Sequence, residues 1–190
     1  MCFLLARAIL WAAVMLVLAA AAGIDLKRRI IPNESVALVA AGGVALSLLS
    51  RPGSTWLSLL FSLAVLLALL VAAHFDVLGG GDAKLIAAAT LLVPPEGIVL
   101  LLGAIALAGG LLSGVYLVLH HAMKGPRLAK RHVARGIRPS TGAFATFRRN
   151  EHARMRAGRS VPYALAVLAG VAFYLGSEIY QCSSGTSCLL

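Results

Sequence analysis

Residues 97–119 read GIVLLLGAIALAGGLLSGVYLVL, a run without a charged side chain. A helix needs about 20 apolar residues to cross the hydrocarbon core of a bilayer, so this run is long enough to span it. The rest of the chain is similar, because 60% of its 190 residues are hydrophobic and only 13% are charged. Soluble domains usually contain about 25% charged residues. The composition therefore excludes an ordinary soluble protein and predicts an all-α, polytopic membrane protein.

Six apolar segments predict a single membrane domain, residues 1–190, with about six transmembrane helices. The fourth segment is short, and it approaches spanning length only if its helix begins near Asp82 and is stopped by Pro94-Pro95. The first segment has an alternative interpretation as a cleaved signal peptide. The basic run at 27–29 follows it directly and favours a retained helix. The expected spans are residues 8–24, 35–50, 54–74, 82–95, 97–119 and 161–178.

The basic residues indicate how the chain is oriented. There are 17 Lys and Arg against 7 Asp and Glu. With the N-terminus outside the cytoplasm, the inner segments 25–34, 74–84 and 120–160 hold 3, 1 and 11 of them, or 15 of the 17. Because cytoplasmic loops are enriched in positive charge, this asymmetry predicts that both termini lie outside. It also explains the basic composition without a nucleic-acid partner. We expect the basic cytoplasmic loop, 120–160, to lie along anionic lipid headgroups.

Four of the seven acidic residues map to the predicted inner face, namely Asp25, Glu34, Asp76 and Asp82. Asp25 directly follows the first span, and Asp82 follows three glycines at 79–81. An ionisable residue at membrane depth is by default a candidate for function. Asp82 also has a purely structural interpretation, because glycine permits a loop and aspartate is a favoured N-cap of a helix.

Asp25 and Asp82 are predicted to lie at the same membrane depth on different helices. Two carboxyl groups that are close together cannot both ionise easily, so they share a proton. One can then activate a water as a base while the other, protonated, polarises a peptide carbonyl. The position and type of these residues therefore predict an aspartic dyad for peptide hydrolysis.

Two short motifs resemble those of the type IV prepilin peptidases. One is Asp25 with Arg29, Pro32 and Asn33, and the other is GGGDAKL at 79–85, which resembles the family's Gly-x-Gly-Asp-x-Lys-Leu. The size and six-span layout are similar to the short form associated with tight-adherence (Flp) pilus systems. That form lacks the cytoplasmic zinc-binding insertion of the long enzymes.

The resemblance implies a prepilin peptidase, an intramembrane aspartic endopeptidase of the bacterial inner membrane. Its substrate would be a prepilin or pseudopilin, whose short basic leader is removed at the cytoplasmic face. No metal or cofactor is implied, and the methyltransferase activity of the long enzymes is not carried over. Pro162-Tyr163 resembles the family's Pro-Tyr-Gly, although Ala164 replaces its glycine. The resemblance makes Asp25 and Asp82 the catalytic pair, with Gly79, Gly81, Lys84, Pro32 and Asn33 as active-site loop or supporting residues.

Two other functions are compatible with these residues. Asp25 and Asp82 would line a polar path in a small proton-coupled transporter or channel. Transporters usually bury such acids near the bilayer midplane, whereas these fall at one interface, so the peptidase is favoured. The chain would otherwise be a non-catalytic membrane subunit of a pilus or secretion assembly. The sequence is equally compatible with a disulfide between the tail residues Cys182 and Cys188 and with two free thiols.

Overall fold

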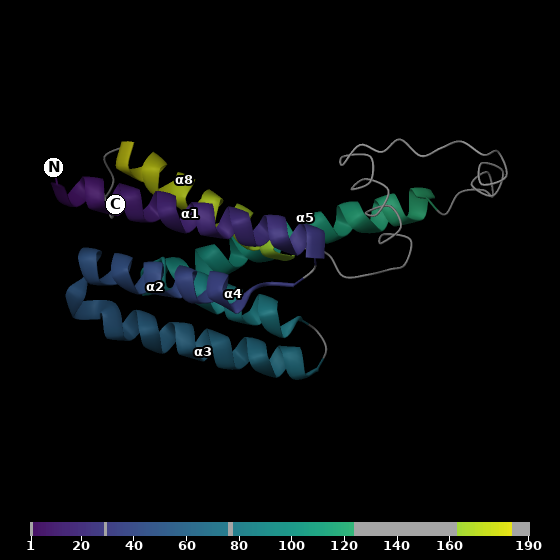
Figure 1. Ribbon diagram of the computed structural model, residues 1–190, viewed down its shortest axis with the longest axis horizontal. Helices are drawn as coiled ribbons and strands as arrows, with labels where there is room; N and C mark the ends of the chain where they lie inside the picture. Colours follow the sequence, from purple (N-terminus) through teal and green to yellow (C-terminus); the bar gives the residue numbers. More distant parts are fainter. Residues whose placement is uncertain (1, 29, 76–77, 124–162, 184–190) are drawn as a thin grey trace. The chain divides into compact units, whose positions relative to one another are not determined.

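The computed structural model describes residues 2–28, 30–75, 78–123 and 163–183, and the regular structure within these ranges is helical (Figure 1). This confirms the predicted all-α fold. Asp76, residues 124–160 of the basic loop and Cys188 lie outside the described residues. The elements are α1 (Cys2–Arg28), α2 (Asn33–Ser50), the 3-10 turn η1 (Pro52–Ser54), α3 (Thr55–His74), α4 (Gly80–Thr90), the 3-10 turn η2 (Pro95–Gly97), α5 (Ile98–Met123) and α8 (Tyr163–Ser183).

The described residues belong to two compact units. The first unit contains residues 2–109 and 163–183, and it includes both Asp25 and Asp82. In the second unit, residues 110–123 are described, and they are the C-terminal half of α5.

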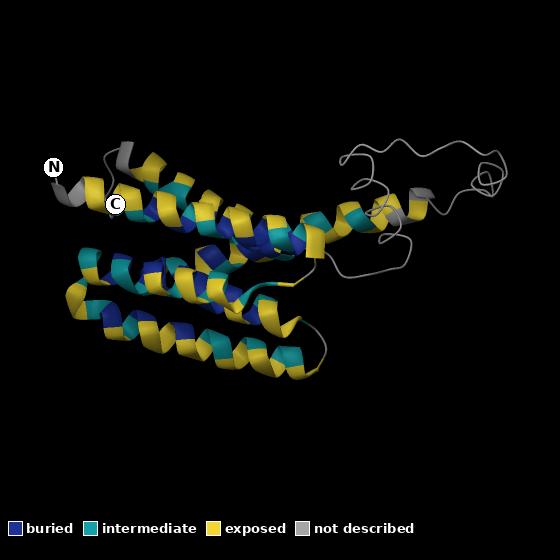
Figure 2. Cartoon of the chain, in the orientation of Figure 1, coloured by how far each residue is buried: buried dark blue, intermediate teal, exposed yellow. Residues whose placement is uncertain are grey.

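Among the residues that the structure describes, five helices are long and apolar enough to cross a membrane. In α3, the buried residues include the polar Thr55, Ser58 and Ser62, whereas large apolar side chains such as Trp56 and Phe61 are exposed (Figure 2). A soluble helix buries its apolar face and exposes its polar one. The reversed pattern of α3 is therefore that of a helix surrounded by lipid. The candidate spans are Leu5–Arg28, Asn33–Ser50, Pro52–His74, Pro95–Leu119 and Tyr163–Gln181.

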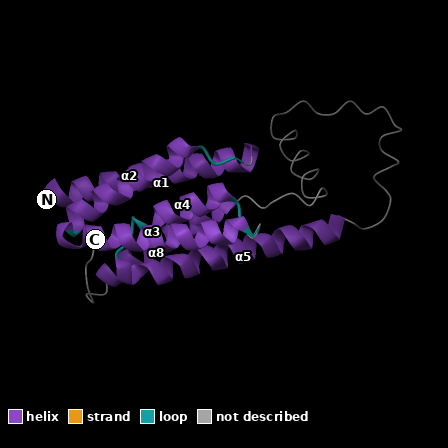
Figure 3. Cartoon of the chain, turned by 90° about the horizontal axis from the view of Figure 1, so that it is seen from below, coloured by secondary structure: helices purple, strands orange, loops and turns teal. Residues whose placement is uncertain are grey.

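The short helix α4 lies at the centre of the first unit, where it packs against α2, α3 and α8 (Figure 3). All its residues from Leu85 to Thr90 are buried. The Ser62 hydroxyl of α3 donates a hydrogen bond of 2.7 Å to the Ala87 carbonyl of α4. Polar side chains hold helices together in lipid in this way, because water does not compete for the bond.

The fourth predicted span, 82–95, corresponds to α4 and is shorter than expected. The helix begins at Gly80 and ends at Thr90, so its 11 residues are too few to cross a bilayer. Residues 91–93 continue in tight turns, with amide-to-carbonyl bonds from Leu91 to Ala88 and from Leu92 to Ala89. Pro94 then adopts an extended conformation. Because proline disfavours helical geometry in the residue before it, the α-helix stops ahead of the Pro94-Pro95 pair.

The first apolar segment is an integral part of the packed unit. Helix α1 packs against both α2 and α8, and Trp11, Val14 and Leu18 from α1 belong to the main hydrophobic core. The segment thus contributes a helix to the packed core, and its retention stays a prediction.

Candidate active site

Asp25 lies in the last turn of α1 and is only 5% exposed. The backbone amide of Ala164 donates a hydrogen bond of 3.1 Å to its Oδ2 atom. Ala164 is the second residue of α8, and amides in the first turn of a helix have no acceptor within their own helix. The carboxyl group of Asp25 therefore satisfies the N-terminal end of a helix that is 139 residues away in the sequence.

Asp82 lies in the first turn of α4, at its third residue, and is half-buried. Gly79 is the N-cap, so the alternative interpretation of Asp82 as the cap of this helix does not hold. The Asp82 carboxylate instead accepts a hydrogen bond from the Gly79 backbone amide. An acidic side chain at the third position often reaches back to the cap amide in this way. This hydrogen bond holds the carboxylate beside the glycine loop, residues 79–81.

Asp25 and Asp82 are electrostatically coupled. Asp82 lies outside the five candidate spans. Burial, and next the negative charge of Asp25, raise the pKa of Asp82 from an ordinary value of 3.8 to about 6. The hydrogen bond from Gly79 acts in the opposite direction but is the weaker effect. A pair in which one carboxyl group retains its proton close to neutral pH can supply both an acid and a base.

The glycines of the loop have different surroundings. A Cβ atom at Gly79 would lie 2.7 Å from the Oδ2 atom of Asp82, closer than a van der Waals contact. At Gly81 the added atom would make an ordinary contact of 3.6 Å with Ile31, in the turn between α1 and α2. At Gly80 it would meet nothing within 4 Å. The structure therefore gives Gly79 the direct steric connection to Asp82.

Replacing Gly79 with alanine is expected to displace the Asp82 carboxylate, so an activity that depends on this carboxylate should fall by about 10-fold, since small misplacements of reacting groups are costly. The thermal unfolding temperature should change little, because the atom that must move is the end of a side chain. Gly80→Ala is the matched control and should retain activity. Cleavage assays and thermal unfolding on both variants check this, and equal activity of the two would contradict the steric role of Gly79.

The other predicted site residues lie near the starts of α2 and α4. Pro32 is the N-cap of α2, where its carbonyl accepts bonds from the amides of Ser35, at 3.1 Å, and Val36, at 3.4 Å. Asn33 is the first residue of α2 and is exposed, and Lys84 is exposed on the first turns of α4.

The start of α8 was not among the site residues predicted from the sequence. Besides the Ala164 amide on Asp25, Tyr163 lies near enough to Asp82 to be affected by its charge. The Tyr163 ring also fills the space beside Gly109, where a Cβ atom would lie 3.0 Å from its Cε2 atom. The sequence signal was the Pro162-Tyr163 pair. The Ala164 contact uses the backbone, so replacement of the family's glycine preserves it.

The described part of the chain contains no group of three or more His, Cys, Asp or Glu residues arranged to hold a metal ion.

Comparison with known families identifies the chain. The type IV leader peptidase family matches residues 12–114, more than half of the sequence, and this range includes Asp25 and Asp82. The chain belongs to the type IV leader peptidase family. It is therefore a membrane peptidase, as the resemblance of its two aspartate motifs indicated. Helix α8, which contacts Asp25, lies beyond the range that this leader peptidase family matches. No curated protein matches the chain, and no solved structure matches it.

Proposed function

We propose that this leader peptidase is an intramembrane aspartic endopeptidase that removes the short basic leader of a prepilin or pseudopilin. The observation that carries the proposal is the electrostatic coupling of Asp82 to the buried Asp25. These are two carboxyl groups from separate helices at one end of the unit, and each is held by a backbone amide. A purely structural role gives no reason to bring two like charges together.

The surroundings of the two carboxyl groups suggest their roles. The Ala164 amide, at the positive end of α8, stabilises a negative charge on Asp25, which suits a general base. Asp82 retains its proton to about pH 6, which suits a general acid. Asp25 takes a proton from water while Asp82 donates a hydrogen bond to the scissile carbonyl oxygen. The water oxygen bonds to the carbonyl carbon, and a proton then passes to the leaving nitrogen as the C–N bond breaks.

The position of the pair suits a substrate that enters from water and continues into lipid. A peptide bond within a helix is shielded, so the substrate must unwind next to the acids. The exposed glycines 79–81 leave room for an extended backbone. We place this end at the cytoplasmic face of the bacterial inner membrane, with both termini outside, from the distribution of basic residues.

Co-expression with a prepilin from the same genome tests the proposal. Leader removal is monitored as a decrease in the size of the pilin on a gel. It should occur only when the wild-type chain is present. Mass spectrometry of the product should find cleavage between the basic leader and the hydrophobic helix. An intact leader in the presence of correctly folded wild-type protein would contradict the proposal and favour a non-catalytic subunit. Uptake of protons or solutes by vesicles containing the protein would favour the transporter.

The pH dependence of cleavage follows from the raised pKa of Asp82. The proposed active form has one proton on the pair, and Asp82 loses this proton as the pH rises through about 6. We therefore expect kcat/KM in detergent to fall above about pH 6, since kcat/KM reports the free enzyme. This falling part of the pH profile reports an apparent pKa of the two coupled carboxyl groups rather than the pKa of one residue. A kcat/KM that rises from pH 6 to 8 would contradict this prediction, because it would require Asp82 to be ionised in the active enzyme.

A further inference from the structure

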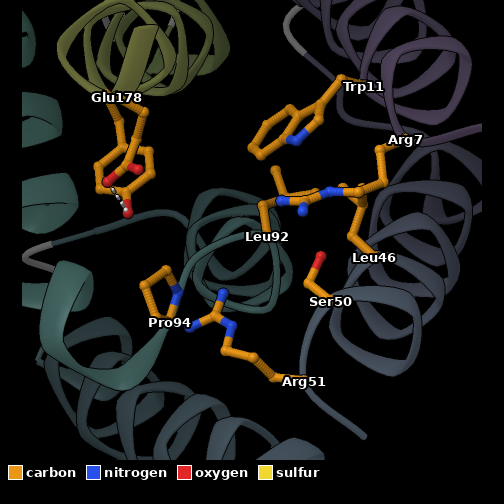
Figure 4. Close-up of a pocket in the computed structure, with 9 residues that line it drawn as sticks. Arg7, Trp11, Leu46, Ser50, Arg51, Leu92, Pro94 and Glu178 are labelled. Carbon is orange, nitrogen blue, oxygen red and sulfur yellow. Dashed lines mark hydrogen bonds between the residues drawn. The ribbon is translucent and has the colours of Figure 1, made fainter. Parts of the chain in front are cut away.

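A second polar site lies at the end of the first unit remote from the aspartates. Arg7 precedes Asp25 by 18 residues in α1, which corresponds to about 27 Å along a helix. Arg7 lines a cavity together with Arg51, which directly follows α2, and with residues of α8 and of the segment after α4 (Figure 4). The cavity has a volume of about 20 Å³, which is enough for one group the size of a water, such as a single phosphate oxygen. We call it the Arg7–Arg51 pocket.

The pocket contains more positive than negative charge. The guanidinium groups of Arg7 and Arg51 are close enough to repel each other, and Glu178 attracts Arg7. Glu178 also accepts a hydrogen bond of 2.8 Å from the Tyr174 hydroxyl. Among the lining residues, two cations therefore face a single carboxylate. An anion placed between the two guanidinium groups would remove their repulsion.

These two arginines are also exceptional in the sequence. They are the two basic residues of the 17 that the predicted topology leaves outside the cytoplasm. Positive charge on that side opposes the usual orientation rule. Arg7 reaches the cavity from α1 and Arg51 from the position after α2, and Figure 4 shows their side chains extending toward the same space. Their convergence is explained if they bind a ligand together.

The depth of the pocket indicates the chemistry of that ligand. Arg7 lies near the start of the span Leu5–Arg28, and Arg51 follows the end of the span Asn33–Ser50. Both are thus at the boundary between hydrocarbon and headgroups, where the phosphates of phospholipids lie. Trp11 forms part of the apolar wall, and tryptophan is enriched at this depth. Arginine binds phosphate oxygens with two parallel hydrogen bonds, and the Ser50 hydroxyl, also in the lining, adds a further donor.

We propose that the Arg7–Arg51 pocket is a binding site for a phosphate group, supplied by a phospholipid headgroup of the surrounding leaflet.

Thermal unfolding of the delipidated protein in a neutral detergent tests this site. The probes are dioctanoyl phosphatidylglycerol, dioctanoylglycerol, which has no phosphate, and inorganic phosphate. We expect phosphatidylglycerol to raise the unfolding temperature of the wild type by roughly 5 °C, since a ligand that binds only the folded state stabilises it. Dioctanoylglycerol should have no effect. The Arg7→Gln/Arg51→Gln double variant should lose the shift, and the control Arg28→Gln, at the other end of α1, should retain it.

The three probes separate the outcomes. A shift with phosphatidylglycerol alone supports the lipid headgroup as the ligand. An equal, arginine-dependent shift with inorganic phosphate overturns the lipid source and assigns a free anion. An unchanged shift in the double variant, or no shift with either phosphate compound, overturns the site. If the double variant does not fold, the single variant Arg51→Gln, at the end of α2, is measured instead. Because no step measures cleavage, the result is independent of the proposed peptidase activity.

Discussion

Replacing either Asp25 or Asp82 with asparagine is expected to lower the rate of leader removal by about 10²–10⁴-fold, the range in which general acid or base catalysis contributes. Asparagine preserves the size of the side chain but cannot take up or release the proton. The double variant should cleave no more slowly than the slower of the two single variants, because the two groups act as one unit. Cleavage of a purified prepilin, measured as an initial rate, checks this prediction.

The unfolding temperature distinguishes a catalytic role from a structural one at Asp82. The fold raises the pKa of Asp82, so the folded protein binds more protons than the unfolded chain between about pH 4 and 6. Stability therefore falls as the pH rises through this window, and the ionised group destabilises the fold at neutral pH. The free energy of unfolding of Asp82→Asn should exceed that of the wild type by about 1 kcal/mol at pH 7.5. The value is modest because solvent screens part of the carboxyl group.

Glu34→Gln is the matched control for the dyad. Glu34 is an exposed acid in the first turn of α2, at the same end of the unit, and its variant should cleave at the wild-type rate. Cleavage that persists in both Asp25→Asn and Asp82→Asn would exclude the dyad. Loss of cleavage in Asp76→Asn but not in Asp25→Asn would reassign its first member.

Replacing Gly43 with alanine is expected to destabilise the protein by about 1–3 kcal/mol, the usual cost of overpacking. Gly43 is buried where α2 crosses the end of α4. A Cβ atom there would lie 2.6 Å from the Cβ atom of Leu91 and 2.9 Å from its backbone carbon. A backbone cannot rotate away as a side chain can, so α2 and α4 must separate. The unfolding temperature should fall by roughly 2–10 °C.

Gly176→Ala in α8 is the control for this close approach. An added Cβ atom at Gly176 meets nothing within 4 Å, so the substitution should be neutral or slightly stabilising, because alanine is the better helix former. Gly43→Ala should also lower cleavage, since α4 carries Asp82. Equal unfolding temperatures for the two variants would contradict the close contact between α2 and α4.

The long helices were predictable because lipid imposes a length and an apolar composition on any helix that spans it. Five predicted spans correspond to helices of 18 residues or more. The fourth was predicted less well, because the apolar run before Pro94 does not indicate where hydrogen bonding stops. α4 is surrounded by protein, and this permits a helix of only 11 residues.

At the candidate site, the two aspartates were predictable from their sequence surroundings, since acids are rare in such a chain and the glycines mark a loop. The partners of the aspartates were not. The Ala164 amide on Asp25 is a backbone contact that any residue type could make. Which residue caps α4 depends on where the helix begins. The cap is Gly79, three residues before Asp82.

By itself, the sequence determined the class of the protein, the approximate spans, the orientation favoured by the basic residues and the two candidate acids. These properties depend on local composition and charge. The tertiary structure decided which groups act on one another: Asp82 and Asp25, the start of α8 and both acids, and Arg7 and Arg51 at the other end. These pairs join residues far apart in the chain, and they exist only because packing around α4 sets the position and rotation of each helix.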